Sequence, residues 1–231
     1  MIVTDLGTLN YQVAWEMQEQ AHARVLAGGE EELLLVEHPP VITLGRRGSI
    51  EGSEMKRHLL ATPDALAAAG VELVQSDRGG DITFHGPGQI VAYPIIRLND
   101  HRLSVGGYVR RLEQAVIDTL ADFNIPARRE PGAVGIWVDP GGLFHWTEAA
   151  KICAIGVRIR RGVSLHGIAL NVTTHLAYFN LIVPCGLTDR PVTSMAALAN
   201  AEAPDINAVR KQLREHLQRV ISSPRITEEA V

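Results

Sequence analysis

Two glycine-rich turns enclose one short strand in residues 78–94, which read RGGDITFHGPGQIVAYP. Glycine has no Cβ, so the Arg-Gly-Gly turn lets the backbone approach another part of the chain, or a ligand, closely. Side chains alternate along a strand, which puts Ile82 and Phe84 on one face and the polar residues, ending at His85, on the other. The Gly-Pro-Gly-Gln turn that follows can hold His85 at the end of the strand. Two interpretations are open: a ledge that binds a ligand, or a glycine-rich hairpin that binds none.

Apolar periodicity divides the rest of the chain into helices and short strands. Helical patterns cover residues 8–29, 62–70, 104–124 and 205–222. Strand patterns cover residues 32–45, with a bend at Pro39-Pro40, and residues 71–75, 81–85, 89–98, 133–138, 151–160 and 163–172. Gly162 fits a hairpin turn between the last two strands. This order favours an α+β (α/β) fold with mixed sheets over regular βαβ alternation. Residues 139–150, DPGGLFHWTEAA, are expected to form a loop or flap.

The first helix has clear start and stop signals. Thr8 or Asn10 can cap its beginning, and two glycines end it at residues 28–29. Val13, Met17 and Ala21 are spaced to fall on one face. That face is the predicted apolar side of the helix.

Composition bounds the class of protein. The 231 residues are 46% hydrophobic, which is enough for one substantial core, and we expect residues 1–231 to form a single domain. A net charge of -4 argues against nucleic acid as a partner. Two cysteines make no disulfide framework, the N-terminus has no secretory signal, and no apolar run is long enough for a membrane span. We therefore expect a soluble, cytoplasmic protein that does not bind a membrane.

Several common sites are not found in the sequence. The glycine-rich stretch matches neither GxxxxGK[ST] nor GxGxxG, so it predicts no nucleotide-phosphate cradle. There is no GxSxG elbow of a serine hydrolase. The histidines are scattered, without HExxH spacing or paired Cys/His ligands, so no metal site is expected. Either His85 or His166 could line a site, but each could equally be a hydrogen-bonded structural histidine.

A thiol and an amine stand out against their apolar surroundings. Cys185 follows the apolar run in NLIVPCGL, and Lys151 begins the apolar strand KICAIGVRIR. If the two meet in space, they could act as a nucleophile and its general acid/base. The alternatives are that Cys185 is a small buried apolar residue and that Lys151 is a solvated strand end. Cys153 lies two residues from Lys151 and is expected to share its strand face, but its other neighbours there make it a core thiol.

Three long motifs, read in order, resemble the octanoyltransferase (lipoyl(octanoyl) transferase) family: RGGDITFHGPGQIVAYPI, KICAIGVRIRRGVSLHGIALNV and NLIVPCGL. The similarity runs from about Thr8 to the region of Ala197. That family is related in fold to lipoate ligases and to the catalytic domain of biotin ligases. The resemblance therefore implies a larger mixed β-sheet and a smaller sheet, flanked by helices.

The resemblance also implies an activity. Family members transfer octanoyl from octanoyl-acyl carrier protein to the acceptor lysine of lipoyl domains, through a cysteine thioester, as the first step of protein lipoylation. The acceptors are the glycine cleavage H protein and subunits of the 2-oxoacid dehydrogenases. Because the donor is already a thioester, no ATP, cofactor or metal is expected. We expect the chain to act as a monomer.

By position, the resemblance makes Cys185 the acyl-thioester nucleophile and Lys151 the residue that tunes its thiol, with Lys151 also our candidate base. Backbone N–H groups at residues 86–88 or around Cys185 could hold the oxyanion. Ile82 and Phe84 would brace the strand or wall an apolar tunnel, and His85 would lie at the mouth near the thiol. The residues implied to bind substrate are Arg78, Gly79, Gly80, Asp81, Ile82, Thr83, Phe84, His85, Ala154, Ile155, Gly156, Gly167, Ile168 and Ala169.

Two other hypotheses compete with the transferase. A ligase of the same fold would activate lipoate or biotin with ATP and would use a lysine without a cysteine nucleophile, so Cys185 discriminates against it. A non-catalytic module that binds a ligand or a carrier protein would tolerate Cys185→Ser without loss of function. The presence of both Cys185 and Lys151 favours the transferase.

Overall fold

The computed structural model describes residues 1–46, 58–139, 148–183, 190–199 and 203–223. Within these residues the larger sheet has seven strands in the order β1-β2-β6-β10-β9-β8-β7. β1 and β2 run parallel, and the other neighbouring strands are antiparallel. The strands are β1 (Ile2–Thr8), β2 (Glu32–Glu37), β6 (Gln89–Ile95), β7 (Arg128–Glu130), β8 (Ala133–Val138), β9 (Ala150–Arg160) and β10 (Val163–Asn171).

The smaller sheet has three strands in the order β4-β3-β5, which are β3 (Val41–Leu44), β4 (Glu72–Gln75) and β5 (Ile82–His85). β3 pairs with β4 in parallel and with β5 antiparallel. The two prolines at residues 39–40 separate β2 from β3, because proline cannot donate to a strand ladder. They mark the point at which the chain leaves the larger sheet for the smaller one.

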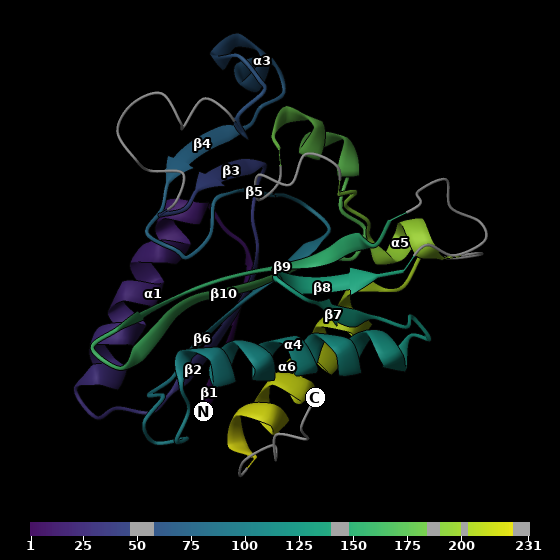
Figure 1. Ribbon diagram of the computed structural model, residues 1–231. Coiled ribbons are helices and arrows are strands. Elements are labelled where there is room, and N and C mark those ends of the chain that lie inside the picture. Colours follow the sequence, from purple (N-terminus) through teal and green to yellow (C-terminus); the bar gives the residue numbers. More distant parts are fainter. Residues whose placement is uncertain (47–57, 140–147, 184–189, 200–202, 224–231) are drawn as a thin grey trace.

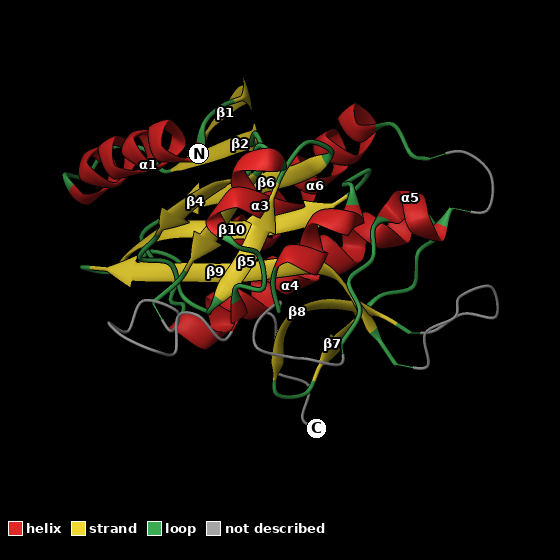
Figure 2. Ribbon diagram, turned by 90° about the horizontal axis from the view of Figure 1, so that it is seen from above, coloured by secondary structure: helices red, strands yellow, loops and turns green. Residues whose placement is uncertain are grey.

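Helices cover both faces of the larger sheet (Figures 1 and 2). α4 (Val105–Asp122) and α6 (Ile206–Ser222) pack against each other and cover one face. α1 (Tyr11–Leu26) and the smaller sheet lie over the opposite face. The remaining short elements are α3 (Pro63–Ala68), the 3-10 helix η1 (Leu176–Leu181) and α5 (Met195–Leu198). No helix in the described ranges is both long and apolar enough to cross a membrane.

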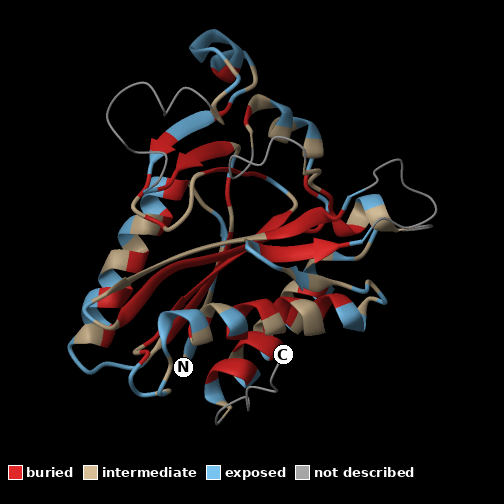
Figure 3. Ribbon diagram, viewed as in Figure 1, coloured by how far each residue is buried: buried red, intermediate tan, exposed pale blue. Residues whose placement is uncertain are grey.

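This architecture confirms the predicted fold class of a larger mixed sheet, a smaller sheet and flanking helices. The largest apolar cluster fills the layer between the sheet and the α4–α6 pair, where β6, β10 and the first four residues of β9 are buried (Figure 3). The predicted hairpin between β9 and β10 is also confirmed. Its turn uses Arg161 and Gly162, both with positive φ. Residues 140–147 lie outside the described part of the chain, so the loop or flap there stays a prediction.

The glycine-rich stretch does not form the hairpin that its sequence allows. β5 pairs with β3 in the smaller sheet, whereas β6 pairs with β2 and β10 in the larger sheet. All residues of both strands are buried. Because an isolated two-stranded hairpin is at best marginally stable, each strand gains by pairing within a larger sheet. The Gly-Pro-Gly turn therefore joins two sheets, and Gly88, with a φ of 80°, makes the bend.

The predicted apolar face of α1 is wrong at Val13, which is exposed. The predicted cap is right, because the Asn10 side chain accepts from the N–H of Gln12. The buried stripe of the helix carries polar residues as well, including Gln18 and His22. The sheet beneath α1 offers these polar side chains hydrogen-bond partners, so they can be buried. A prediction from apolar positions alone therefore does not find this stripe.

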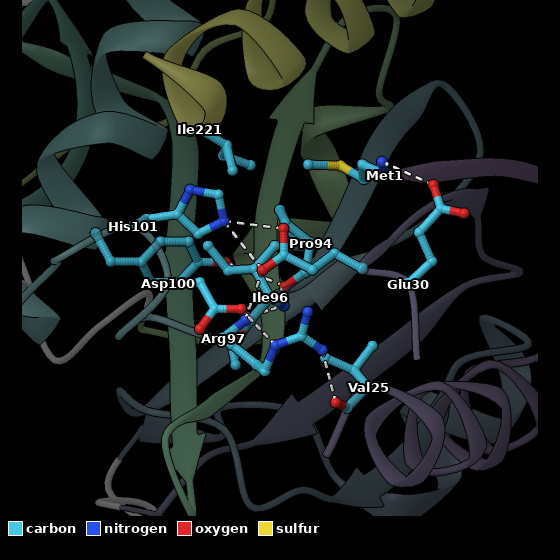
Figure 4. A network of polar contacts seen from close by, with 12 residues as sticks. Met1, Val25, Glu30, Pro94, Ile96, Arg97, Asp100, His101 and Ile221 are labelled. Carbon is cyan, nitrogen blue, oxygen red and sulfur yellow. Dashed lines mark hydrogen bonds and ion pairs between the residues drawn. The ribbon is translucent and has the colours of Figure 1, made fainter. Parts of the chain in front are cut away.

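Arg97 anchors the C-terminal end of α1 to the larger sheet (Figure 4). Its Nη1 donates to the carbonyl oxygens of Val25 at 2.8 Å and Gly29 at 2.7 Å, and its Nε donates to Asp100 at 2.6 Å. Carbonyl groups at the end of a helix have no partner within the helix, so a cation there stabilises it. This anchor fixes α1 across the sheet, with Tyr11 at the opposite end.

Candidate active site

A pocket of about 270 Å³ lies between the smaller sheet and the face of the larger sheet that β6, β9 and β10 form. One side of it is exposed at the start of β8, where Val134 is 54% exposed. The opposite end is formed by buried side chains, among them Tyr11 and Tyr93. Of the fourteen residues predicted to bind substrate, those that line the pocket are Arg78, Gly80, Asp81, Ile82, Thr83, His85, Ala154, Ile155, Gly156, Gly167, Ile168 and Ala169.

Phe84 and Gly79 are not among the lining residues. Ile82 and Phe84 belong to the apolar cluster under the smaller sheet, where the Phe84 ring stacks on Tyr178 with 4.8 Å between centroids. Thr83 and His85 lie on the pocket side, as the strand alternation predicts. Phe84 therefore braces β5 from behind.

The Arg-Gly-Gly turn packs against β9. The N–H of Gly79 donates to the carbonyl oxygen of Val157 at 3.1 Å, and a Cβ on Gly79 would lie only 2.7 Å from that oxygen. The Arg78 guanidinium donates to the backbone oxygens of Thr43 and Asp81, both at 2.6 Å. Gly79 thus allows the backbone of the turn to pack closely against the backbone of β9, and Arg78 holds the turn to β3.

Lys151 lines the pocket although it is only 7% exposed. Its Nζ lies 4.7 Å from the centroid of the Trp137 ring, and the guanidinium carbon of Arg190 lies 5.1 Å from the same ring. The indole N–H donates to the carbonyl oxygen of Ala133 at 3.0 Å, which fixes the ring in place. A fully buried indole thus binds two cations, each at a distance where cation–π attraction is effective.

A β-bulge in β9 separates Lys151 from Cys153. Ile136 pairs with Cys153 and the next residue, Trp137, pairs with Lys151, so Ile152 is an extra residue on β9. The prediction that the two side chains share a face is therefore wrong: Lys151 faces the pocket and Cys153 faces the core. The prediction that Cys153 is a core thiol is confirmed. Burial raises its pKa to about 12, which leaves no reactive thiolate near neutral pH.

Cys185 lies outside the described residues, and its contact with Lys151 stays a prediction. The stretch that follows it is described. The N–H of Lys151 donates to the carbonyl oxygen of Pro191 at 2.8 Å, and the N–H of Thr193 donates to that of Lys151 at 2.9 Å. The chain just after the predicted nucleophile is therefore paired with the strand at Lys151.

A directed chain of hydrogen bonds fixes His85. Asn171 donates its amide to the Thr193 carbonyl oxygen at 3.0 Å, so its own oxygen accepts from Gln89 Nε2 at 2.9 Å. The Gln89 oxygen in turn accepts from His85 Nδ1 at 2.8 Å. Burial lowers the pKa of His85 well below its usual value. His85 is therefore a buried neutral side chain and does not lie at an exposed mouth, while its position near the Cys185 thiol stays a prediction.

One predicted oxyanion donor is already engaged. The N–H of Gly88 donates to the Glu37 carboxylate at 2.9 Å. Among the described residues, no group of three or more His, Cys, Asp or Glu side chains is placed to hold a metal ion.

Among the pocket and near-pocket residues that were not found from the sequence, three are large aromatic side chains. Tyr11 and Tyr93 line the buried end, and Trp137 supports Lys151. Alternation along residues 89–95 places Tyr93 on the same face as Val91, but only the sheet order shows that this face meets the pocket. Trp137 carries no local signal, because its partner Lys151 is brought to it by strand pairing.

Comparisons with known proteins agree with this geometry. A model of the family "Lipoyl protein ligase A/B catalytic domain" matches residues 10–218. The octanoyltransferase of Chloroflexus aggregans is 51% identical over 199 residues, which cover 85% of this chain and 84% of the relative. The octanoyltransferase of Solibacter usitatus is 49% identical over 216 residues, which cover 93% of this chain and 90% of the relative.

Solved structures support the fold. Lipoate-protein ligase A bound with ATP superposes with a TM-score of 0.74 at 16% identity, over 95% of this chain and 85% of that one. Biotin protein ligase from Aquifex aeolicus, in complex with biotin and ATP, gives 0.53 at 12% identity, over 95% and 70%. Because the family model spans most of the chain and the curated relatives share about half of its residues, the chain belongs to the octanoyltransferase family.

Proposed function

We propose that this octanoyltransferase-family chain moves octanoyl from octanoyl-acyl carrier protein to the lysine of a lipoyl domain, through a thioester on Cys185. The observation that carries the proposal is the position of Lys151. Its side chain lines the pocket, and its backbone pairs with the stretch just after Cys185. Apolar lining residues such as Val91 and Ala169 suit a saturated acyl chain.

The first half of the reaction loads the enzyme. The Cys185 thiolate, paired with the Lys151 ammonium, bonds through its sulfur to the thioester carbonyl carbon of the donor. The tetrahedral oxyanion collapses and the bond from carbon to the carrier sulfur breaks. The Lys151 ammonium donates a proton to that leaving sulfur, which leaves octanoyl on Cys185 and Lys151 neutral.

The second half passes octanoyl to the acceptor. The neutral amine of the lipoyl-domain lysine attacks the Cys185 thioester, and Lys151 takes the proton that the amine loses. The bond from carbon to Cys185 sulfur breaks, an amide forms, and the thiolate–ammonium pair is restored. The acceptors are lipoyl domains of 2-oxoacid dehydrogenase subunits and the glycine cleavage H protein. The chain acts as a single-domain monomer in this scheme, with no cofactor.

Intact-protein mass spectrometry tests the thioester route. The purified chain is mixed with octanoyl-acyl carrier protein beside two variants, Cys185→Ala and Cys153→Ala. We expect an octanoyl adduct on the wild type and on Cys153→Ala, none on Cys185→Ala, and loss of the adduct when a lipoyl domain is added.

Other results would contradict specific parts of the proposal. An adduct on Cys185→Ala that disappears in the double variant would make Cys153 the nucleophile. No adduct on any protein, with octanoyl still on the carrier, would exclude the transferase route and leave ATP-dependent ligation as the reaction to assay.

A further inference from the structure

A cluster of six aromatic rings closes the buried end of the pocket. Neighbouring rings have centroids 5.3 to 6.4 Å apart, within the range of aromatic pairing. We call these residues the ring cluster, and they are Tyr11, Trp15, His38, His85, Tyr93 and His166. Four of them line the pocket directly, namely Tyr11, His85, Tyr93 and His166.

Strand register separates the ring cluster from Lys151. β9 and β10 pair Ala154 with Ala169 and Gly156 with Gly167, and these small residues line the pocket. Lys151 lies on β9 on the far side of the Ala154–Ala169 pair from the Gly156–Gly167 pair. His166 is adjacent to Gly167 on β10 and therefore lies at the opposite end of this row. A floor of small residues therefore runs from Lys151 to the rings, with room above it for a narrow chain.

Within the described residues, hydrogen bonds hold five of the six rings, whereas the buried Trp15 Nε1 and His166 Nδ1 have no hydrogen-bond partner. The Tyr11 hydroxyl is 2.8 Å from Ser76 Oγ. The Tyr93 hydroxyl donates to His38 Nε2 at 2.8 Å, because His38 Nδ1 donates to the Leu9 carbonyl oxygen at 2.7 Å. Burial lowers the pKa of His38 to about 4 and lowers the pKa of His85 as well. Burial also lowers the pKa of His166, although the bond to Asp77 acts in the opposite direction. The three imidazoles are therefore uncharged near neutral pH, and their ring faces offer apolar surface to the pocket.

His166 is held in the wall at a conformational cost. Its φ is 57°, in the left-handed region that side chains other than glycine rarely adopt. Its Nε2 is 2.6 Å from Asp77, and its backbone N–H donates to Gln18 at 2.9 Å. A strained residue that persists at the end of a pocket points to a role in that pocket.

We propose that the ring cluster is the end wall of the acyl site and limits the length of the acyl chain, whose terminal methyl packs against Tyr93 and His166. This inference rests on the proposed function, which attaches the acyl group near Lys151. A longer chain would have to displace hydrogen-bonded rings, whereas a shorter chain would leave apolar surface unfilled.

The His166→Gly variant tests the wall with little backbone strain, because glycine accepts a positive φ. The matched control is Arg161→Gly, an exposed position in the same hairpin with a φ of 53°. The readout is kcat/KM with hexanoyl-, octanoyl-, decanoyl- and dodecanoyl-acyl carrier protein. We expect His166→Gly to raise the decanoyl-to-octanoyl ratio about tenfold or more, and Arg161→Gly to leave it unchanged.

A second variant and a second readout keep the inference separate from the proposed function. Tyr93→Leu removes a ring from the wall and should shift the preference in the same direction. The melting-temperature increase caused by 1-hexanol, 1-octanol, 1-decanol and 1-dodecanol reports pocket length without any acyl transfer. We expect its maximum to move to a longer alcohol in both variants.

Unchanged length preference in both variants, with both proteins folded, would overturn the end-wall assignment. If the wild type transfers no acyl group while the alcohol series shifts as expected, the proposed function fails and the end wall stands. If transfer occurs but neither series shifts, the end wall fails and the proposed function stands.

Discussion

At the scale of single residues, the site is organised by what surrounds Lys151. The Trp137 ring supports both its ammonium and the Arg190 guanidinium. Arg190 is the first described residue after the Cys185 segment, and it also forms an ion pair with Glu130 at 2.7 Å. Trp137 thus ties the lysine to the segment that follows the predicted nucleophile.

Lys151→Ala should slow both acylation of the enzyme and transfer to the acceptor. General acid–base groups contribute roughly 10²- to 10⁴-fold to a rate, so we expect a loss within that range. Rapid-quench measurement of the two half-reactions, at matched protein concentration, checks it. Lys211→Ala, on the exposed side of α6, is the matched control and should keep the wild-type rates. Full activity in Lys151→Ala would remove Lys151 from the mechanism.

At the scale of elements, two irregular features build the pocket. The bulge at Ile152 turns Lys151 to the same side as Ala154 and Gly156. The glycine-rich turn packs on β9 and brings the smaller sheet over the floor of the pocket. Both features depend on contacts between segments that are far apart in the sequence.

Gly79→Ala should destabilise the fold, because its Cβ would meet the carbonyl oxygen of Val157 at 2.7 Å. Overpacking of this kind costs about 1 to 3 kcal/mol. Gly106→Ala is the control, since that site in α4 has no atom within 4 Å of the added Cβ, and it should stabilise by about 1 kcal/mol. Urea unfolding of both variants measures the difference. Equal free energies of unfolding in the two variants would mean that the turn can shift enough to relieve the clash between the added Cβ and the Val157 oxygen.

At the scale of the whole molecule, buried histidines make stability depend on pH. Burial lowers the pKa of His38 to about 4 and also lowers those of His85 and His166. Unfolding restores a pKa near 6.5, so the unfolded chain binds more protons below that value. The contribution of His38 to stability is therefore complete above about pH 6.5 and is lost as the pH falls toward 4.

Urea unfolding between pH 7.5 and pH 4.5 should show this loss. His38 alone accounts for on the order of 2 kcal/mol between neutral pH and pH 5. His38→Gln should reduce the slope, whereas the exposed His175→Gln should leave it unchanged. A free energy of unfolding that stays constant over this range would show that the folded protein admits protons to these side chains.

Local signals predicted most of the elements correctly. Asn10, Thr62 and Ser104 cap the helices that follow them, because each side chain accepts from an N–H within the first turn. Errors arose where the partner of a segment decides the outcome. Val13 was assigned to the wrong face, and residues 81–95 were allowed a hairpin that the structure does not form.

The sequence by itself determined α1, α3, α4 and α6, the strands other than β1 and β7, the turn at Gly162 and, through its motifs, the family. These depend on backbone preferences and on periodicity over a few residues. Only the tertiary structure decided that Lys151 and Cys153 face opposite sides, since a bulge is defined by the register with a neighbouring strand. It also decided that six aromatic rings meet at one end of the pocket, because burying them together requires α1 and both sheets to be in place.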